Sequence, residues 1–357
     1  MQFKFYLVLL LIIVSYLHSY SWGFYAHKKI NRIAIFSLPK EMFSFYKIHI
    51  DFITDKATAP DKRRYILKEE ATRHYIDFED YGDSAIYKLP HSYFKLKEYY
   101  PEDSLLKFGI VPWHIQRVCY QLTEAFKSKN TPAILRISAD LGHYIADANV
   151  PLHTTKNYNG QLTNQVGIHG FWESRLPELF SNQYDLFTGK AIYINSIHEY
   201  SWQMVVNAHS ALDSVLNFEK ILDQQFPNDK KFSYEQRGSV NLKVYSKSYS
   251  KAYHHMLSGQ VERQMRAAIK STAALWYTCW INAGQPDLNQ FIDKKTYIEE
   301  DTVQSTPLNE LEIRPEAHLF LEEFNSCSHH HDCCEEKNEI VADKRKWWMM
   351  FLVRSER

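Results

Sequence analysis

The sequence predicts an all-α protein. Its apolar residues recur mainly every three to four positions, which places them on one face of a helix. Residues 111–127 and 259–283 keep this pattern over many turns. No strong alternation of apolar and polar residues indicates strands, and no internal repeat is evident. We therefore expect packed helices to form the core.

Residues that favour turns separate the predicted helices. Pro39 divides the first two, Pro112 stands in the first turn of the third, and Pro151 ends the fourth. In chain order, the expected helices are 27–36, 42–49, 111–127, 132–148, 168–180, 196–224 and 259–283. Two long loops rich in Gly, Asp, Asn or Thr are expected at 77–94 and 154–167. Loops of this length inside a domain are often functional.

The chain divides into a leader, one main domain and a tail. Residues 1–21 have the pattern of a signal peptide: Lys4, an apolar run over 7–14, and a small-x-small cleavage site at 19–21. The apolar run is shorter than the ~20 residues of a transmembrane helix, so we expect export to the periplasm or the extracellular space. No transmembrane span is expected in the mature chain. The main domain is 22–285, with a helical insertion at about 181–255, and 286–357 is a charged tail expected to be poorly ordered.

Charge and cysteine content narrow the function classes. Lys and Arg together number 42, as do Asp and Glu, so no net charge favours a polyanion. This argues against non-specific nucleic-acid binding but leaves room for a small phosphate site. The number and spacing of the five cysteines do not indicate a disulfide framework, and Cys119 and Cys279 are expected in the core. A Cys/His cluster at 327–334 could bind metal or belong to an unstructured tract.

The segment 141–173 carries the strongest chemical signal. His143 and Asp147 are four residues apart, as are His169 and Glu173, and His153 lies between the two pairs. Residues at this spacing share one helix face, with Cβ atoms roughly 5–6 Å apart. Two such side chains can bind one zinc ion, whose ligands lie about 2.0–2.3 Å away. Two pairs in one segment predict a metal site.

Further metal-competent side chains precede this segment. His74 follows apolar residues just before a predicted loop, Asp61 lies upstream of it, and Trp22 and His27 lie at the predicted mature N-terminus. Each has an ordinary alternative, because a lone His is more often a core residue and Asp61 could cap a helix. Arg64, three residues after Asp61, could be an exposed helix charge. Together, however, these residues extend the predicted metal site.

The whole set resembles the zinc-dependent phospholipase C and S1–P1 nuclease superfamily. The order Trp, His, Asp, His, His-x3-Asp-x5-His, His-x3-Glu is that superfamily's ligand order. Two local motifs match as well, Asp147-Ala-Asn-Val-Pro151-Leu152-His153 and His74-Tyr75-Ile76-Asp77. The motifs cover about residues 22–180. The resemblance implies a multi-helix fold with a cleft for three zinc ions, which makes 22–285 the catalytic domain.

The resemblance also implies three sets of zinc ligands. The first set is Asp61, His74, His143 and Asp147. The second set is His153, His169 and Glu173, which leaves a position open for water or substrate. The third set is the α-amino group and carbonyl of Trp22 with His27 and Asp147, so that Asp147 bridges two ions. Cleavage after Ser21 would expose the amino group of Trp22.

The implied activity is a secreted zinc-dependent hydrolysis of phosphodiesters, in which a metal-bridged hydroxide attacks phosphorus. Zinc can lower the pKa of bound water from ~15.7 to ~7, so no Ser or His nucleophile is required. Asp61 would orient this water or accept a proton, and Arg64 would bind a phosphate oxygen. Tyr75 and Asp77 occupy positions where the nucleases carry a base-stacking aromatic and a base-binding carboxylate.

Three functions remain open at this stage. Glu173 in place of Asp, and the fifteen residues between His153 and His169, resemble the phospholipases. The motifs at Trp22 and Asp61 resemble the nucleases, but their Gly-Gly-Asn loop is not evident. We expect a monomeric phospholipase C-like enzyme acting on phospholipid. The alternatives are an S1/P1-type nuclease for single-stranded nucleic acid (endonuclease and 3'-nucleotidase) and a zinc-binding protein without catalysis.

Overall fold

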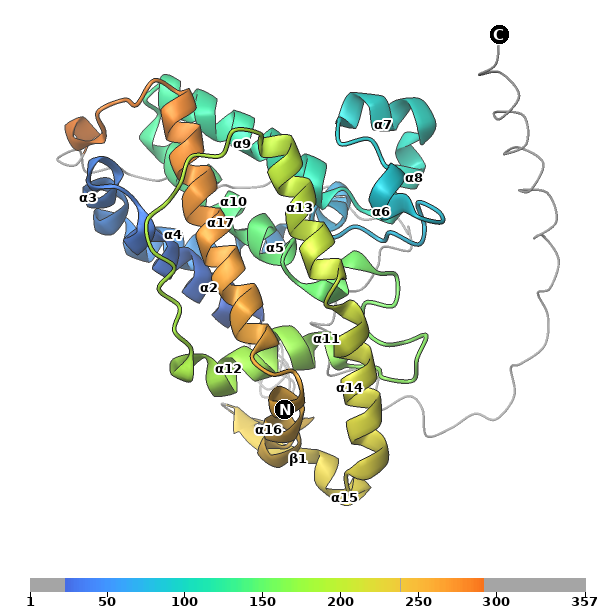
Figure 1. Ribbon diagram of the computed structural model, residues 1–357. Coiled ribbons are helices and arrows are strands. Elements are labelled where there is room, and N and C mark those ends of the chain that lie inside the picture. The colour runs from blue at the N-terminus through green and yellow to red at the C-terminus, as the bar shows by residue number, and fades with distance from the viewer. Residues whose placement is uncertain (1–22, 238, 292–357) are drawn as a thin grey trace, which may run out of the picture. The chain divides into compact units, whose positions relative to one another are not determined.

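The computed structural model describes residues 23–237 and 239–291, and helices dominate them (Figure 1). This confirms the prediction of a mostly helical protein. The expected signal peptide, Trp22 and nearly all of the expected tail lie outside the described residues. Within them, no helix combines the length and the apolar character that crossing a membrane requires.

Five helices build the centre of the fold. They are α2 (Gly23–Ala34), α9 (Val111–Lys127), α10 (Thr131–Asp147), α13 (Ile197–His209) and α17 (Gln260–Asn282). Helix α9 packs against α10, α13 and α17, and α10 and α17 both contact α2 (Figure 1). Proline near the start of α9 and α10 suits a helix N-terminus, where a backbone N–H has no helical partner.

Aromatic side chains fill the core between these helices. Trp276 of α17 is fully buried, and its indole N–H donates to the Ser138 carbonyl of α10 at 3.0 Å. The Tyr46 ring stacks on Trp276 with 5.0 Å between ring centroids. The Tyr46 hydroxyl lies 2.8 Å from Ser138 Oγ. These contacts satisfy the polar atoms that large aromatic residues bring into a core.

Shorter helices and one hairpin complete the fold. The other α-helices are α3 (Lys40–Ile48), α4 (Ile50–Lys56), α5 (Ala59–Arg63), α6 (Ala85–Lys88), α7 (Tyr93–Tyr99), α8 (Glu102–Phe108), α11 (Ile168–Gly170), α12 (Leu176–Phe180), α14 (Leu212–Gln225), α15 (Asn228–Lys231) and α16 (Lys247–Met256). Short 3-10 helices are η2 (Ile35–Ser37), η3 (Lys68–Arg73), η4 (Pro151–Thr154), η6 (Ser181–Gln183) and η7 (Leu288–Phe291), and η5 (Phe171–Arg175) is a π-helical turn. The expected loop 77–94 contains α6, and the expected loop 154–167 follows η4.

The expected helical insertion at about 181–255 contains one hairpin as well as helices. Strand β1 (Phe232–Arg237) pairs antiparallel with β2 (Val240–Tyr245), so that Phe232 lies opposite Tyr245. The hairpin is stabilised by tertiary packing, because Tyr245 stacks on Phe171 with 3.9 Å between ring centroids. The sequence does alternate apolar and polar side chains over 232–235 and 240–244, which is the pattern of a strand, and the sequence analysis overlooked this short signal.

The expected helix 196–224 is two helices. Helix α13 ends at His209 and α14 begins at Leu212. Near the break, Ser210 Oγ donates to the Asn207 carbonyl at 2.7 Å, and Ser214 Oγ donates to the Ala211 carbonyl at 2.7 Å. Serine side chains compete in this way for backbone carbonyls and favour helix ends. Both halves keep apolar faces, so periodicity alone does not reveal the break.

A glycine allows α2 and α10 to approach closely. A Cβ atom on Gly142 of α10 would lie 2.0 Å from Asn31 Oδ1 of α2. Asn31 is fully buried, and its side-chain amide donates to the Ala139 carbonyl at 3.0 Å. Because α2 carries His27 and α10 carries His143, this contact brings two candidate ligands together.

Candidate metal centre

Eight of the predicted metal ligands lie within the described residues, and all are buried. Their exposed fractions range from 0% to 8%. They come from the N-terminal, central and later helices, and they are His27 on α2, Asp61 on α5, His74 after η3, His143 and Asp147 on α10, His153 on η4, His169 on α11 and Glu173 on η5. Such a concentration of buried imidazoles and carboxylates is costly unless the groups are paired or bind a cation.

The central group consists of His74, His143 and Asp147. His74 Nδ1 lies 2.8 Å from Asp147 Oδ2 and 3.0 Å from His143 Nε2. His143 Nε2 lies 3.2 Å from Asp147 Oδ2. His143 and Asp147 are one helical turn apart on α10, so the spacing read from the sequence places both on one face.

The N-terminal group consists of His27, Asp61 and His143. His143 Nε2 lies 3.6 Å from Asp61 Oδ1, and the His27 and His143 rings stack at 4.0 Å. His27 Nε2 also lies 3.4 Å from Asp147 Oδ1. The structure thus groups Asp61 with His27 as well as with the first predicted set, since Asp61 Oδ1 is 3.9 Å from His74 Nδ1.

The distal group consists of His153, His169 and Glu173. His153 Nε2 lies 2.9 Å from His169 Nε2 and 3.2 Å from Glu173 Oε2. His169 Nε2 lies 3.0 Å from Glu173 Oε2. Glu173 belongs to the π-helical turn η5. Such turns widen a helix locally and occur often at functional sites.

The donor atoms fit the requirements of a small divalent cation. Ligands bound to one tetrahedral zinc ion at about 2.1 Å lie roughly 3.4 Å apart, and the separations within the central and distal groups are 2.8–3.2 Å. His143 Nδ1 donates to the Ala57 carbonyl at 2.8 Å, and His153 Nδ1 donates to the His74 carbonyl at 2.7 Å. These bonds direct Nε2 of each ring towards its group, as outer partners of metal-binding histidines do.

The groups interact strongly through their charges. Burial lowers the pKa of His143, but the carboxylates of Asp147 and Asp61 outweigh this effect and raise the pKa to about 9. For His27, burial and the nearby His143 lower the pKa to about 4. In the metal-free protein at neutral pH, His143 is therefore protonated and the stacked His27 is neutral.

Both central and distal carboxylates remain ionised. Burial would raise the pKa of Asp147, but His143, His153 and His27 hold it well below its usual range. Burial likewise opposes ionisation of Glu173, but His169 and His153 keep its pKa well below its usual range. Metal binding requires ionised carboxylates and neutral imidazoles. The two carboxylates are therefore already in the form that binds a metal ion.

The remaining predicted site residues lie around the groups. Arg64 Nη1 is 3.7 Å from Asp61 Oδ1, and its side chain is 13% exposed. Tyr75 and Asp77 are only 3% and 4% exposed, and the Tyr75 hydroxyl donates to the Lys107 carbonyl at 3.1 Å. A stacking role for Tyr75 gains no support from this buried position.

The sequence analysis missed a polar cluster behind His74. Glu70 is fully buried and accepts hydrogen bonds from Arg63 at 3.4 Å, from Arg73 and from the Tyr144 hydroxyl. One signal could have found it, because Glu70 precedes His74 by four residues, the spacing of the two ligand pairs. Arg63, Arg73 and Tyr144 have no comparable signal.

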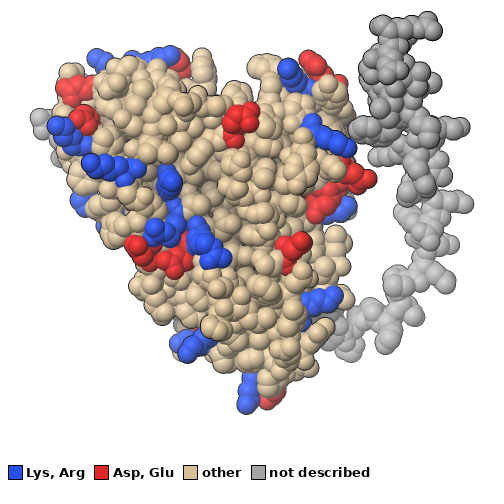
Figure 2. All heavy atoms as spheres, in the orientation of Figure 1, with Lys and Arg blue, Asp and Glu red and all other residues tan. Residues whose placement is uncertain are grey.

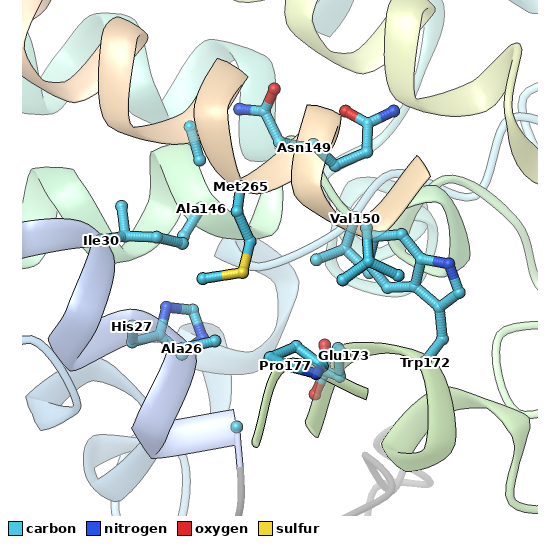
Figure 3. A pocket seen from close by; sticks show the side chains of 14 residues that line it. Ala26, His27, Ile30, Ala146, Asn149, Val150, Trp172, Glu173, Pro177 and Met265 are labelled. Carbon is cyan, nitrogen blue, oxygen red and sulfur yellow. The ribbon is translucent and has the colours of Figure 1, made fainter. Parts of the chain in front are cut away.

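A mainly apolar pocket adjoins the site, between α2, α10, η5 and α17 (Figure 3). His27 and Glu173 line it beside Trp172, Val150 and Met265. The further lining residues are Gly23, Ala26, Ile30, Ala146, Asn149, Pro177, Val261, Gln264 and Ala268. The pocket therefore connects two of the candidate metal groups to an apolar wall.

Fold and site together define a mostly helical protein whose described part contains three buried His/Asp/Glu groups that could bind metal ions. A comparison of the chain with protein-family models gives no match, and a comparison with curated proteins gives no significant match.

Proposed function

We propose that this protein is a secreted, zinc-dependent phosphodiester hydrolase with the fold and trizinc cleft of the phospholipase C and S1–P1 nuclease superfamily, acting on phospholipid. One observation carries the proposal. Ligands that are scattered over more than a hundred residues, and that match the superfamily's order in the sequence, converge into three adjoining buried groups. Unrelated histidines and carboxylates would have no reason to meet in this way.

Each group would contribute to one ion. The central group with Asp61 would hold the first ion, and the distal group would hold the second. His27 and Asp147 would hold the third with Trp22, which lies outside the described residues. When bound, zinc would supply Lewis acidity towards a phosphoryl oxygen and would lower the pKa of water.

Two side chains would act directly on the substrate or its proton. Asp61 lies beside both the central and the N-terminal group, so it would accept a proton or orient water. Arg64, 3.7 Å from Asp61, would bind a non-bridging phosphate oxygen. A guanidinium suits this role because it can bind two oxygens at once.

The pocket beside His27 and Glu173 favours phospholipid over nucleic acid. Its fourteen lining residues include no Lys or Arg, and most are apolar. A polyanionic strand would gain from cations at this position, whereas an uncharged group attached to the phosphate gains from apolar contact. On the face that Figure 2 shows, several basic side chains form a row on the left side with acidic side chains beside its lower end, and the rest of the face carries scattered charges of both signs.

A nuclease remains the second candidate because of one contact. The Asp61–Arg64 pair has the spacing found in the nuclease branch and lies at the metal groups in the structure. An Arg that holds the phosphate of a nucleotide would occupy this position.

Substrate hydrolysis by the chain that begins at Trp22 tests the proposal. Purified protein is incubated with phosphatidylcholine vesicles, single-stranded DNA and RNA, each with and without a chelator and added zinc. We expect release of phosphocholine that chelation abolishes and zinc restores. His169→Gln should lose this activity, whereas His198→Gln, at an exposed histidine, should retain it. Turnover of DNA or RNA alone would favour the nuclease, and tight zinc binding without turnover would leave a zinc-binding protein.

A further inference from the structure

The two ring nitrogens of His74 face different partners. Nδ1 faces the central group, 2.8 Å from Asp147 Oδ2 and 3.0 Å from His143 Nε2. Nε2 is buried and makes no hydrogen bond within the described part of the chain. A carboxylate oxygen, Glu70 Oε1, lies 3.9 Å from Nε2. His74 therefore stands between the candidate ligands and a second buried carboxylate.

Glu70 is held firmly in its place. Its side chain is fully buried, and Arg63, Arg73 and the Tyr144 hydroxyl donate hydrogen bonds to it. Arg63 is itself fixed by Asp140, at 2.9 Å. Burial would raise the pKa of Glu70, but Arg63 and the neighbouring cations keep it below its usual value. The carboxylate is thus oriented by three donors.

We propose that Glu70 is a positioning residue for the metal centre, which accepts a hydrogen bond from the Nε2–H of His74 and so leaves Nδ1 to bind the metal. The inference rests on the proposed metal binding. A ring movement of roughly 1 Å brings Nε2 from 3.9 Å to hydrogen-bond distance of Glu70. Metal-binding histidines usually donate their second N–H to a carboxylate or carbonyl, which fixes the tautomer and the ring orientation.

The structure also offers a simpler role for Glu70, which is to neutralise Arg63 and Arg73. The two roles differ in what they require of the side chain. Neutralisation requires a negative charge, whereas positioning His74 requires an oxygen that accepts a hydrogen bond. Glu70→Gln and Glu70→Met both remove the charge at similar side-chain length, and only Gln keeps an acceptor. The pair of variants therefore separates the two roles.

Zinc affinity, measured by competition with a chelator, is the first readout. Outer partners of metal-binding histidines typically contribute 10–100-fold to metal affinity. We expect Glu70→Met to bind one of its zinc ions 10–100-fold more weakly than the unchanged protein does. The zinc affinity of Glu70→Gln should lie between those two values. Glu69→Gln, an exposed neighbour with the same charge change, should bind as the unchanged protein does. Equal affinities for Glu70→Gln and Glu70→Met would overturn the proposal.

The tautomer of His74 gives a second readout that needs no variant. In zinc-loaded protein labelled with ¹⁵N-histidine, Nε2 should carry a proton and Nδ1 should show the shift of a metal-bound nitrogen. Metal on Nε2 would refute the inference even if Glu70→Met failed to fold. If the unchanged protein binds no zinc, the proposed function itself fails. Zinc binding without the expected tautomer or affinity difference removes only the role of Glu70.

Discussion

Replacing Gly142 by alanine tests the helix contact that positions the site. Gly142→Ala would usually stabilise a helix by about 1 kcal/mol. Here the added Cβ would lie 2.0 Å from Asn31 Oδ1, whereas carbon atoms in contact lie about 3.5–4.0 Å apart. Asn31 is fully buried and bound to the Ala139 carbonyl, so it has little room to move.

The magnitude follows from three terms. Overpacking a core costs about 1–3 kcal/mol, and an unpaired buried amide costs about 1–3 kcal/mol more. Against these stands the gain in helix propensity of about 1 kcal/mol. We therefore expect Gly142→Ala to lower the free energy of unfolding by about 1–5 kcal/mol. Zinc affinity should fall too, because the added Cβ would push α2 away from α10 and would move His27 away from His143.

Urea denaturation of the zinc-free protein measures the first effect, and chelator competition measures the second. The control is a double-mutant cycle with Asn31→Ala, which removes the atoms that the new Cβ would meet. In that background, Gly142→Ala should cost little or should stabilise the protein. If Gly142→Ala is as stable as the unchanged protein while Asn31 is present, the close contact between α2 and α10 is not as described.

Two further predictions concern the metal groups. Asp147→Ala should lower bound zinc more than His153→Ala does, because the two oxygens of Asp147 lie within 3.8 Å of four imidazoles from all three groups; equal zinc contents by elemental analysis would argue against a bridging role. Zinc binding at pH 7 should release about one proton from His143, whose pKa is raised to about 9, and none from His27, whose pKa is lowered to about 4 and which is already neutral. Calorimetry in buffers of different ionisation enthalpy measures this number, and a release unaffected by Asp147→Asn would contradict the assigned cause of the His143 shift.

The spacing of apolar residues along the chain predicted a helix well where one apolar face continued without interruption. The expected helix 111–127 coincides with α9, because its apolar face is continuous and Pro112 marks its first turn. The prediction failed at Ser210 and at the hairpin. The break near Ser210 carries local serine hydrogen bonds to the Asn207 and Ala211 carbonyls, and the hairpin packs on a distant segment through the stacking of Tyr245 on Phe171. A residue-by-residue pattern does not contain this stacking contact.

The same division applies to the site. The i, i+4 spacing of His143 and Asp147 placed both on one helix face, and that inference needed no tertiary information. It could not show that Asp61 adjoins His27 as well as His74, or that Glu70 stands behind His74. It also could not show that Tyr75 is buried. Each of these facts depends on the packing of one segment against another.

By itself, the sequence determined that the protein is mainly helical and which side chains could bind metal, because both depend on residue type and on spacing within one segment. Only the tertiary structure decided that α2, α10 and the turn bearing Glu173 bring those side chains together. The close contact at Gly142 and the outer carboxylate of Glu70 likewise arise only in the folded chain. The physical reason is that convergence depends on how helix faces fit, and this fit is set by atoms far apart in the chain.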